Sequence, residues 1–300
     1  MKEIKFFFTN GPYRGSHRFR RFTPDNSSRW GNIVSIDDID EADYVVVYQS
    51  TVSDLSNIPP EKIVYIQHEP DEFFFVKHMW DNISPLSHKY PFSAQAAPLI
   101  EWNTMLKTYD ELKRENFPPK TKELSWVTSN YGDGSQPPDI QVLSGHRLRM
   151  QFLQNFLSKF PDKMDLFGKR LEGPRYNYRC NKGALFDKWA GVKDYRYTFG
   201  FENSCQKWFV SEKLGDGILA GCMTIYWGCP NLEEFLPDGS FIRLDIAKED
   251  APERAIEIVN SDFREKHLDA IREAKELILD KYNIWATIYR ILNQLDKRVR

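Results

Sequence analysis

A glutamate and a lysine stand side by side near the end of the stretch YRYTFGFENSCQKWFVSEKL, residues 195–214. The apolar residues around the pair recur every four positions and predict a buried helical face: Val210, Leu214 and Ile218. Glu212 and Lys213 then fall in the first turn of the helix, where unpaired backbone N–H groups form the positive end of the helix dipole. A lysine there is unfavourable by roughly a few tenths of a kcal/mol unless an anion compensates it. Two interpretations follow: an anion site, with the carboxylate accepting from sugar hydroxyls, or two solvated surface charges.

Polar residues follow the strand that is expected before this helix. Aromatic side chains alternate along residues 195–201 and share one face, so that Glu202 projects to the other face. Asn203 and Ser204 come where the strand ends, which is the edge at which open α/β sheets bind ligands. Gly221 stands where a helix C-cap glycine belongs. The segment therefore predicts a strand, a polar loop and a helix arranged around a ligand.

Short β-rich runs alternate with helix-like patterns along most of the chain. Several of these runs are almost continuously apolar, as in parallel strands that are covered on both faces. The alternation predicts a doubly wound α/β architecture. The expected strands are residues 4–9, 44–49, 63–67, 124–129, 164–167, 195–201, 223–227 and 241–244.

The charged, proline-bearing segment 113–122 is the best candidate for a domain boundary. It follows a helical pattern near residues 100–112, and a second flexible stretch, residues 131–139, indicates a loop near a site or hinge. From about Ala251 the pattern is helical to the end. We therefore expect three parts: an N-terminal Rossmann-like domain over 1–115, a C-terminal Rossmann-like domain over 120–280, and a helix or tail over 281–300 that packs back.

The composition limits the possible partners. The 300 residues include 41 Lys and Arg against 43 Asp and Glu, so we expect no bulk attraction to nucleic acid or anionic membranes. The four cysteines form no CxxC pair and have no matching histidine spacing, which favours free thiols over a zinc site. The sequence contains neither a signal-peptide pattern nor a membrane-spanning apolar run, so the expected location is cytoplasmic.

Longer motifs around the Glu-Lys pair resemble the α-1,3-fucosyltransferases. They are F-E-N-S, then F-V-S-E-K-L, then I-Y-W-G-C-P-N and F-L-P-D-G-S-F-I-R-L-D. The similarity covers roughly residues 124–245 and is weaker over the N-terminal half. It implies a GT-B fold, in which two Rossmann-like domains face each other across a cleft and the C-terminal one binds the nucleotide sugar. It also implies an inverting transfer of fucose from GDP-fucose to a hydroxyl of a glycan acceptor.

The resemblance assigns donor-binding roles to the central motif. Glu212 and Lys213 would bind the ribose and diphosphate of GDP-fucose, and Glu202 and Asn203 would line the same pocket. The family usually has a tyrosine three residues before the Glu-Lys pair, where this chain has Phe209. That difference leaves open a donor such as UDP-xylose or another GDP-sugar. A non-catalytic nucleotide- or carbohydrate-binding module is the alternative of another class.

A second cation is expected beside Lys213. The family has an arginine shortly after a Ser-Asn strand end, and here Ser129 and Asn130 end a strand before the helical pattern LRMQFLQNFLSKF. Arg147 is the expected diphosphate partner, Arg149 is the nearest rival, and an ordinary surface arginine is the alternative. Two fixed cations would make a metal or other cofactor unnecessary, because they stabilise the developing phosphate charge.

The expected general base lies in the N-terminal half. Glu69 directly follows the strand expected at 63–67 and is held extended by Pro70, so its carboxylate is in position to accept a proton. The family has a Glu-Ser-Pro-type segment whose glutamate is the proposed base, and this chain matches it without the serine. His68 and Glu72 are close competitors on the acceptor side.

Two further patterns in this half carry weaker signals. Asp38-Ile39-Asp40 is formally the D-x-D of metal-dependent sugar transferases, but it lies in the half opposite the donor, so we expect solvated surface or a helix start. The loop 10–22 interleaves arginines with aromatic residues. It predicts an acceptor-site loop that includes Arg14, or a plain surface loop.

Overall fold

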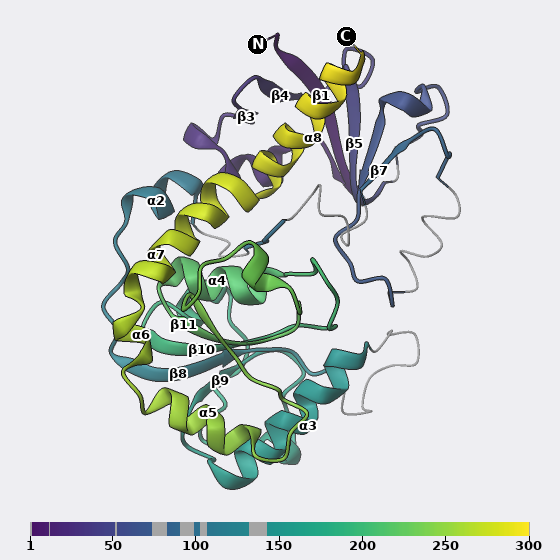
Figure 1. Cartoon of the computed structure of the whole chain (residues 1–300). Coiled ribbons are helices and arrows are strands. Elements are labelled where there is room, and N and C mark those ends of the chain that lie inside the picture. Colours follow the sequence, from purple (N-terminus) through teal and green to yellow (C-terminus); the bar gives the residue numbers. More distant parts are fainter. Residues whose placement is uncertain are drawn as a thin grey trace. The chain divides into compact units, whose positions relative to one another are not determined.

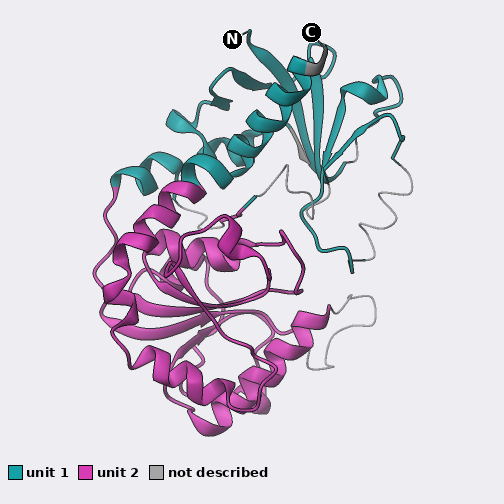
Figure 2. Cartoon of the chain, in the orientation of Figure 1, with its two compact units in different colours: residues 1–99, 107–114, 279–300 teal, residues 100–106, 115–278 magenta. Residues whose placement is uncertain are grey.

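The computed structural model describes residues 2–11, 13–51, 53–73, 83–90, 99–102, 107–131 and 143–299. The chain divides into two compact units (Figure 2). Unit 1 comprises residues 1–99, 107–114 and 279–300, and unit 2 comprises residues 100–106 and 115–278. Residues 100–106 thus belong to unit 2, and the last helix belongs to unit 1.

Unit 1 is built on a seven-stranded, mostly parallel sheet. Its strands are β1 (Ile4–Gly11), β2 (Tyr13–Arg14), β3 (Arg29–Trp30), β4 (Ile33–Ile36), β5 (Tyr44–Thr51), β6 (Ile63–Ile66) and β7 (His88–Tyr90). Their order is β3-β4-β1-β5-β6-β7, with β2 paired to β1. Only β2 and β3 run antiparallel to their neighbours among these described strands. The central strands are apolar on both faces, as expected for strands covered on both sides.

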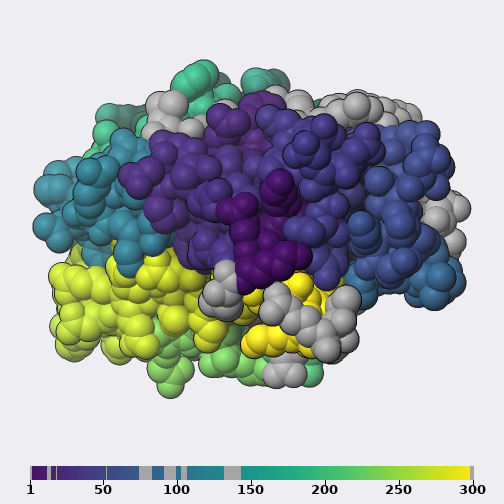
Figure 3. Space-filling model, turned by 90° about the horizontal axis from the view of Figure 1, so that it is seen from above, coloured from purple at the N-terminus to yellow at the C-terminus, as the bar shows by residue number. Residues whose placement is uncertain are grey.

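The C-terminal helix α8 (Ile284–Val299) packs within unit 1. The ring of Trp285 meets that of Phe6 edge-on at 5.5 Å, and its indole N–H donates to the carbonyl of Phe19 at 2.8 Å. Asn293 donates to the side chain of Asn32 at 3.1 Å. In the view of Figure 3 the yellow residues of the C-terminal segment accordingly lie beside the purple N-terminal ones. The first strand and the last helix thus share one core.

Unit 2 is built on a five-stranded sheet in which every pairing is parallel. Its strands are β8 (Lys122–Val127), β9 (Asp165–Phe167), β10 (Tyr195–Phe201), β11 (Met223–Trp227) and β12 (Phe241–Arg243). The order is β12-β11-β10-β8-β9, so the chain runs outward from β8 to β9 and then returns to β10 on the other side of β8. The strand order therefore reverses between β8 and β10, and such a switch point is where open α/β sheets bind ligands.

Helices cover both faces of the unit 2 sheet. Helix α4 lies on one face, and α3 and α5 lie on the other (Figure 1). The α-helices are α2 (Tyr109–Arg114), α3 (Ser144–Lys159), α4 (Glu212–Ala220), α5 (Ala251–Val259), α6 (Phe263–Lys266), α7 (Leu268–Leu277) and α8. Shorter helical turns are η1 (His17–Phe22), η2 (Pro24–Asn26), η3 (Pro60–Lys62), η4 (Pro174–Tyr176), η5 (Lys188–Gly191), η6 (Leu232–Glu234) and η7 (Ile278–Tyr282). Within the ranges given above, no helix is long and apolar enough to cross a membrane.

All eight predicted strands are confirmed, each to within two residues at its ends. The predicted helix near 100–112 is wrong in extent, because α2 begins only at Tyr109. The Thr108 hydroxyl accepts from the Glu111 N–H at 3.2 Å, and the Glu111 carboxylate accepts from the Thr108 N–H at 2.7 Å. This reciprocal capping box starts the helix at that point. The apolar residues before it are buried in irregular backbone: Leu99, Ile100 and Trp102.

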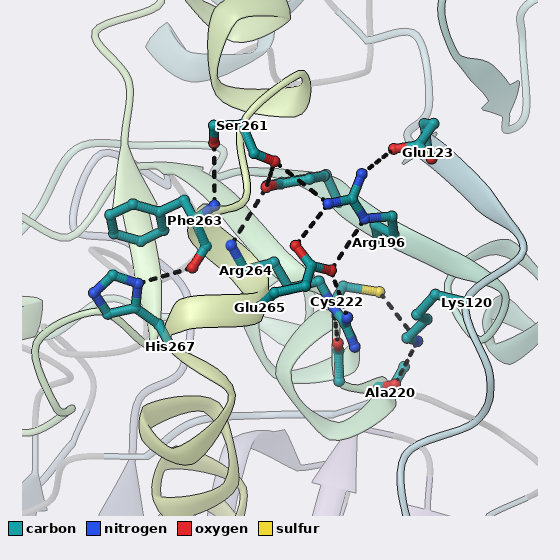
Figure 4. A network of polar contacts seen from close by, with 12 residues as sticks. Lys120, Glu123, Arg196, Ala220, Cys222, Ser261, Phe263, Arg264, Glu265 and His267 are labelled. Carbon is teal, nitrogen blue, oxygen red and sulfur yellow. Dashed lines mark hydrogen bonds and ion pairs between the residues drawn. The ribbon is translucent and has the colours of Figure 1, made fainter.

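The amino ends of the unit 2 strands are fixed by a charged network (Figure 4). Arg196, at the start of β10, pairs with Glu123 of β8 at 2.7 Å and with Glu265 of α6 at 2.6 Å. The bond from Arg196 lowers the pKa of Glu265 to about 2. Lys120 donates to two backbone carbonyls, of Lys193 at 2.8 Å and of Ala220 at 2.6 Å. The cations at this edge of the sheet therefore hold the fold together.

Candidate functional site

A pocket of about 340 Å³ lies at the opposite edge, where β8 and β10 end. Its walls come from the segment after β8, the first turns of α3, the end of β9, η5 and the start of α4. The charged residues that line the pocket are Arg149, Lys169, Lys188, Glu212 and Lys213. Four cations thus face one carboxylate at the topological switch point, an arrangement that attracts an anion.

The predicted start of helix α4 is confirmed. Ser211 is the N-cap, and its hydroxyl accepts from the Lys213 N–H at 3.4 Å and from the Lys213 ammonium at 3.0 Å. The helix ends at Gly221, whose φ of 77° and ψ of 25° are the left-handed values of a C-cap glycine. Lys213 therefore sits in the first turn with its ammonium at the helix N-terminus, where the dipole alone disfavours it.

Glu202 lies behind the pocket and is not among its lining residues, so its expected contact with a donor stays a prediction. Its carboxylate is completely buried and accepts from the Ser211 N–H at 2.8 Å and the Ser211 hydroxyl at 2.5 Å. Burial raises the pKa of Glu202, although Lys213, 4.0 Å away, and Ser211 oppose the rise. Glu202 thereby fixes the N-cap serine and, through it, the direction of Lys213.

Glu212 is the only carboxylate among the described residues that line the pocket. Its Oε1 lies 2.7 Å from the ammonium of Lys188 and 3.3 Å from that of Lys213. Burial by itself would raise its pKa, but these two cations outweigh burial and hold the pKa of Glu212 well below its usual value. Glu212 is therefore ionised at neutral pH.

Helix α3 brings Arg149 to the pocket, whereas the expected residue, Arg147, is exposed and does not line it; which of the two binds a diphosphate stays a prediction. The reason for this difference in position is the phase of the helix, because Gly145, Arg149 and Leu153 recur four residues apart on the buried face. Arg149 is 2% exposed and donates from Nη1 to the Phe201 carbonyl at 3.1 Å.

The guanidinium of Arg149 lacks a counter-ion within the described part of the chain. Its buried Nε makes no hydrogen bond there, and no described carboxylate forms an ion pair with it. Burial lowers the pKa of Arg149 to about 10, against the opposing effect of Glu202 and Glu212. The group is still cationic at neutral pH, and a buried cation that forms no ion pair is costly unless an anion joins it.

His146 contributes a neutral imidazole to the same wall. Its Nδ1 accepts from the Leu143 N–H at 3.1 Å, so a neutral ring carries its proton on Nε2. Its ring lies 5.5 Å from that of Tyr131 and is tilted against it by 31°, and the guanidinium of Arg170 lies over that tyrosine at 4.7 Å. Burial, together with Arg149 and Lys213, lowers the pKa of His146 to about 3.

Other expected donor residues take different positions around the pocket. Ser129 and Asn203 line it, and Asn130 is buried, with its N–H donating to the Lys169 carbonyl at 3.1 Å. Phe209 is buried, and it is not among the lining residues. Whether these side chains contact a donor stays a prediction.

Three basic residues of the pocket lining were not expected from the sequence: His146, Lys169 and Lys188. Each reaches the pocket through tertiary packing that no local sequence pattern predicts. The weak signal for Lys188 is the preceding Asp187, whose carboxylate accepts from the Trp189 N–H at 3.0 Å and starts η5. An aspartate before a short helical turn marks an N-cap and says nothing of a ligand.

The expected base lies in unit 1. Glu69 follows β6, and its backbone carbonyl accepts from the Gln67 side chain at 2.8 Å. That same amide donates to Asp71 at 2.9 Å, which fixes the turn after the strand. His68 is buried, with its ring 5.5 Å from that of Tyr48.

The remaining N-terminal candidates lie on the surface of unit 1 or outside the described residues. Glu72 is exposed, as are Asp38 and Asp40 of the D-x-D pattern. Arg14 belongs to the short strand β2, and its side chain lies outside the described residues, as do residues 132–139 of the expected hinge loop. The described residues include no group of His, Cys, Asp and Glu that could hold a metal ion.

Comparisons with known proteins agree with this architecture. The profile of glycosyltransferase family 10 (fucosyltransferase), C-terminal part, matches residues 117–295. A fucosyltransferase-like protein of Arabidopsis thaliana is 32% identical over 114 residues, which are 38% of this chain. The chain aligns with 20% of the length of that relative.

A solved glycosyltransferase shows the same fold. A crystal structure of a glycosyltransferase from Rickettsia africae covers 100% of both chains at 10% identity and a TM-score of 0.50. A crystal structure of an α1,3-fucosyltransferase covers 98% of this chain and 90% of its own at 14% identity and a TM-score of 0.48. Each unit carries the parallel α/β sheet of the GT-B type. Because the family profile spans more than half of the sequence, this chain belongs to glycosyltransferase family 10, the fucosyltransferases.

Proposed function

We propose that this chain transfers fucose from GDP-fucose to a hydroxyl group of a glycan acceptor, with inversion at the anomeric carbon. Membership of family 10 supports the donor class. The observation that carries the proposal is Arg149, a buried guanidinium without a described carboxylate partner in the wall of the switch-point pocket. A diphosphate supplies the negative charge that this cation lacks.

The pocket offers a separate group for each part of a nucleoside diphosphate. Arg149, Lys213 and the first N–H groups of α4 would hold the diphosphate. Glu212, which stays ionised, would accept from the ribose hydroxyls. Asn203 and Ser129 complete the wall between these groups. Fixed cations of this kind stabilise the negative charge of a departing nucleotide, and we propose that no metal is needed for this step.

The proposed chemistry is a single displacement at the anomeric carbon of the donor sugar. Glu69 would remove the proton of the acceptor hydroxyl while that oxygen forms its bond to the anomeric carbon. The bond from that carbon to the β-phosphate oxygen breaks, and GDP departs with the electron pair. The transition state would resemble an oxocarbenium ion, as in glycoside hydrolysis. His68 and Glu72 are the competing bases, and Arg14 is an acceptor-side candidate.

Two arginines on one helix provide a matched test of this proposal. Arg149→Met removes the pocket cation, whereas Arg147→Met removes an exposed charge two residues away. We expect Arg149→Met to lower kcat/KM for GDP-fucose by about 10²–10³-fold, because a fixed charge on the leaving group is lost. Arg147→Met should stay within about twofold of the wild type.

The assay measures nucleotide released from a panel of GDP- and UDP-sugars in the presence of a glycan acceptor, with and without EDTA. Arg149→Lys and the melting temperature of each variant separate a loss of charge from a loss of folding. A preference for UDP-sugars would overturn the fucosyl donor, and loss of turnover in EDTA would overturn the metal-free mechanism. Equal activity of the two arginine variants would mean that the pocket cation takes no part in the reaction.

A further inference from the structure

Lys188 lies at the mouth of the candidate site and touches its single described carboxylate. It opens the short helix η5, and its ammonium donates to Glu212 Oε1 at 2.7 Å. The two side chains are 31% and 19% exposed, so the pair is neither fully buried nor a solvated surface contact. Both residues line the pocket. Their ion pair therefore belongs to the surface that a ligand meets.

Charge in the neighbourhood holds Lys188 in its cationic form. Burial by itself would lower its pKa, but Glu212, Asp216 and Glu101 outweigh burial and raise the pKa of Lys188. The residue is thus a cation at neutral pH that forms an ion pair with Glu212. It balances negative charge close to the pocket.

Glu212 presents an electrostatic problem for the proposed ligand. It occupies the first turn of α4 beside Lys213, where the diphosphate would bind. Two like charges a few ångströms apart repel by about 1 kcal/mol in water and by several times more near a protein surface. Glu212 also bonds to Lys213 at 3.3 Å and competes with the phosphates for that ammonium. The carboxylate therefore needs a cationic partner that neutralises its charge, so that it does not repel the anion.

We infer that Lys188 is a positioning residue for nucleoside diphosphates: it neutralises Glu212 and frees Lys213 for the phosphates. The inference rests on the proposed function, and it concerns the diphosphate part of the ligand. Lys188 acts through Glu212, which keeps its second carboxylate oxygen for the sugar. Without Lys188, the uncompensated carboxylate holds Lys213 and repels the phosphates.

The test uses two ligands and a double-mutant cycle in the full chain. Inorganic pyrophosphate reports only the anion site, whereas GDP also reports the ribose contacts. Calorimetry compares the wild type, Lys188→Met, Glu212→Gln and the double variant, with Lys188→Arg as the charge-conserving variant. Lys266→Met is the matched control, because Lys266 forms an exposed ion pair with Asp262 at 2.8 Å elsewhere in unit 2.

We expect Lys188→Met to weaken pyrophosphate binding by about tenfold or more, and Lys266→Met to leave it unchanged. Adding Glu212→Gln should restore pyrophosphate binding to within about threefold of the wild type, because the repulsion is gone. GDP binding should stay weak in both Glu212→Gln backgrounds. Lys188→Arg should bind both ligands nearly as the wild type does.

Each other outcome overturns the inference in a recognisable way. If the double variant binds pyrophosphate as weakly as Lys188→Met, Lys188 contacts the phosphates directly or only supports the fold, and a lowered melting temperature marks the second case. If Lys188→Met binds as well as the wild type, Lys188 has no part in the site. If the wild type itself binds neither GDP nor pyrophosphate, the proposed function is wrong, and the inference that rests on it is overturned as well.

Discussion

At the scale of single residues, the site combines groups that the sequence indicates with groups that only the fold brings in. The pair Glu212 and Lys213 was predicted from its place in a helix N-terminus, and the structure puts both in the pocket. The choice between Arg147 and Arg149 could be made from the apolar periodicity of α3, because Leu153 and Leu157 follow Arg149 at four-residue intervals on the buried face. Lys188 arrives from a turn far along the chain, and no spacing rule connects it to Glu212.

The neutral imidazole of His146 predicts a dependence of stability on pH. Its pKa is about 3 in the folded chain and about 6.5 in an unfolded chain, so between these values only the unfolded chain binds the proton. Folding is therefore favoured above pH 6.5 and loses stability as the pH falls. We expect this one group to remove about 2 kcal/mol of unfolding free energy between pH 7 and pH 5.

Urea unfolding at several pH values measures this effect. His146→Gln should show a smaller loss of stability between pH 7 and pH 5 than the wild type, because it lacks the titrating ring. His17→Gln, which alters an exposed histidine, should follow the wild type. Parallel pH curves for the wild type and His146→Gln would show that the ring titrates normally in the folded chain.

At the scale of elements, long apolar runs were predictable and short pieces were not. The eight predicted strands have four or more residues of β-rich sequence, and all are confirmed. Four strands of unit 1 were missed: β2, β3, β4 and β7. They have two to four residues each and show no alternating pattern, whereas the equally short β9 and β12 were predicted from apolar residues within and beside them. Their pairing is set by neighbouring strands in the sheet.

The N-terminus of α3 approaches the polar loop after β10 so closely that it requires a glycine. The Gly145 N–H donates to the Asn203 carbonyl at 2.9 Å, and a Cβ at Gly145 would overlap that same carbonyl. We expect Gly145→Ala to lower the free energy of unfolding by about 1–3 kcal/mol. It should also weaken GDP binding, because α3 carries both His146 and Arg149 to the pocket.

Gln151→Ala, on the exposed face of the same helix, is the control and should change stability by less than about 0.5 kcal/mol. Chemical unfolding and calorimetric titration with GDP provide the two readouts. A Gly145→Ala variant with wild-type stability and affinity would mean that the close approach of α3 does not shape the pocket.

At the scale of the whole molecule, the two edges of the unit 2 sheet differ in how their charged residues are paired. At the amino edge the charged residues form ion pairs with one another, as Arg196 and Glu265 do. The carboxyl edge gathers four cations around one carboxylate in a chain whose net charge is only -2. The overall charge therefore gives no hint of this local excess of cations.

The division into two units also separates binding from chemistry in the proposed mechanism. The donor pocket belongs to unit 2, whereas Glu69 belongs to unit 1. A change at Glu69 should therefore affect proton removal and leave the contacts of the donor unaltered. A loss of transfer without a loss of binding in such a variant would distinguish a transferase from a module that only binds nucleotides.

The most direct test measures GDP-fucose binding and fucose transfer in the wild type and in Glu69→Gln. We expect both proteins to bind GDP-fucose with the same affinity, and Glu69→Gln to transfer about 10²–10⁴-fold more slowly because the base is lost. A wild-type protein that binds GDP-fucose and transfers nothing to any glycan acceptor, or a Glu69→Gln variant as fast as the wild type, would contradict the account.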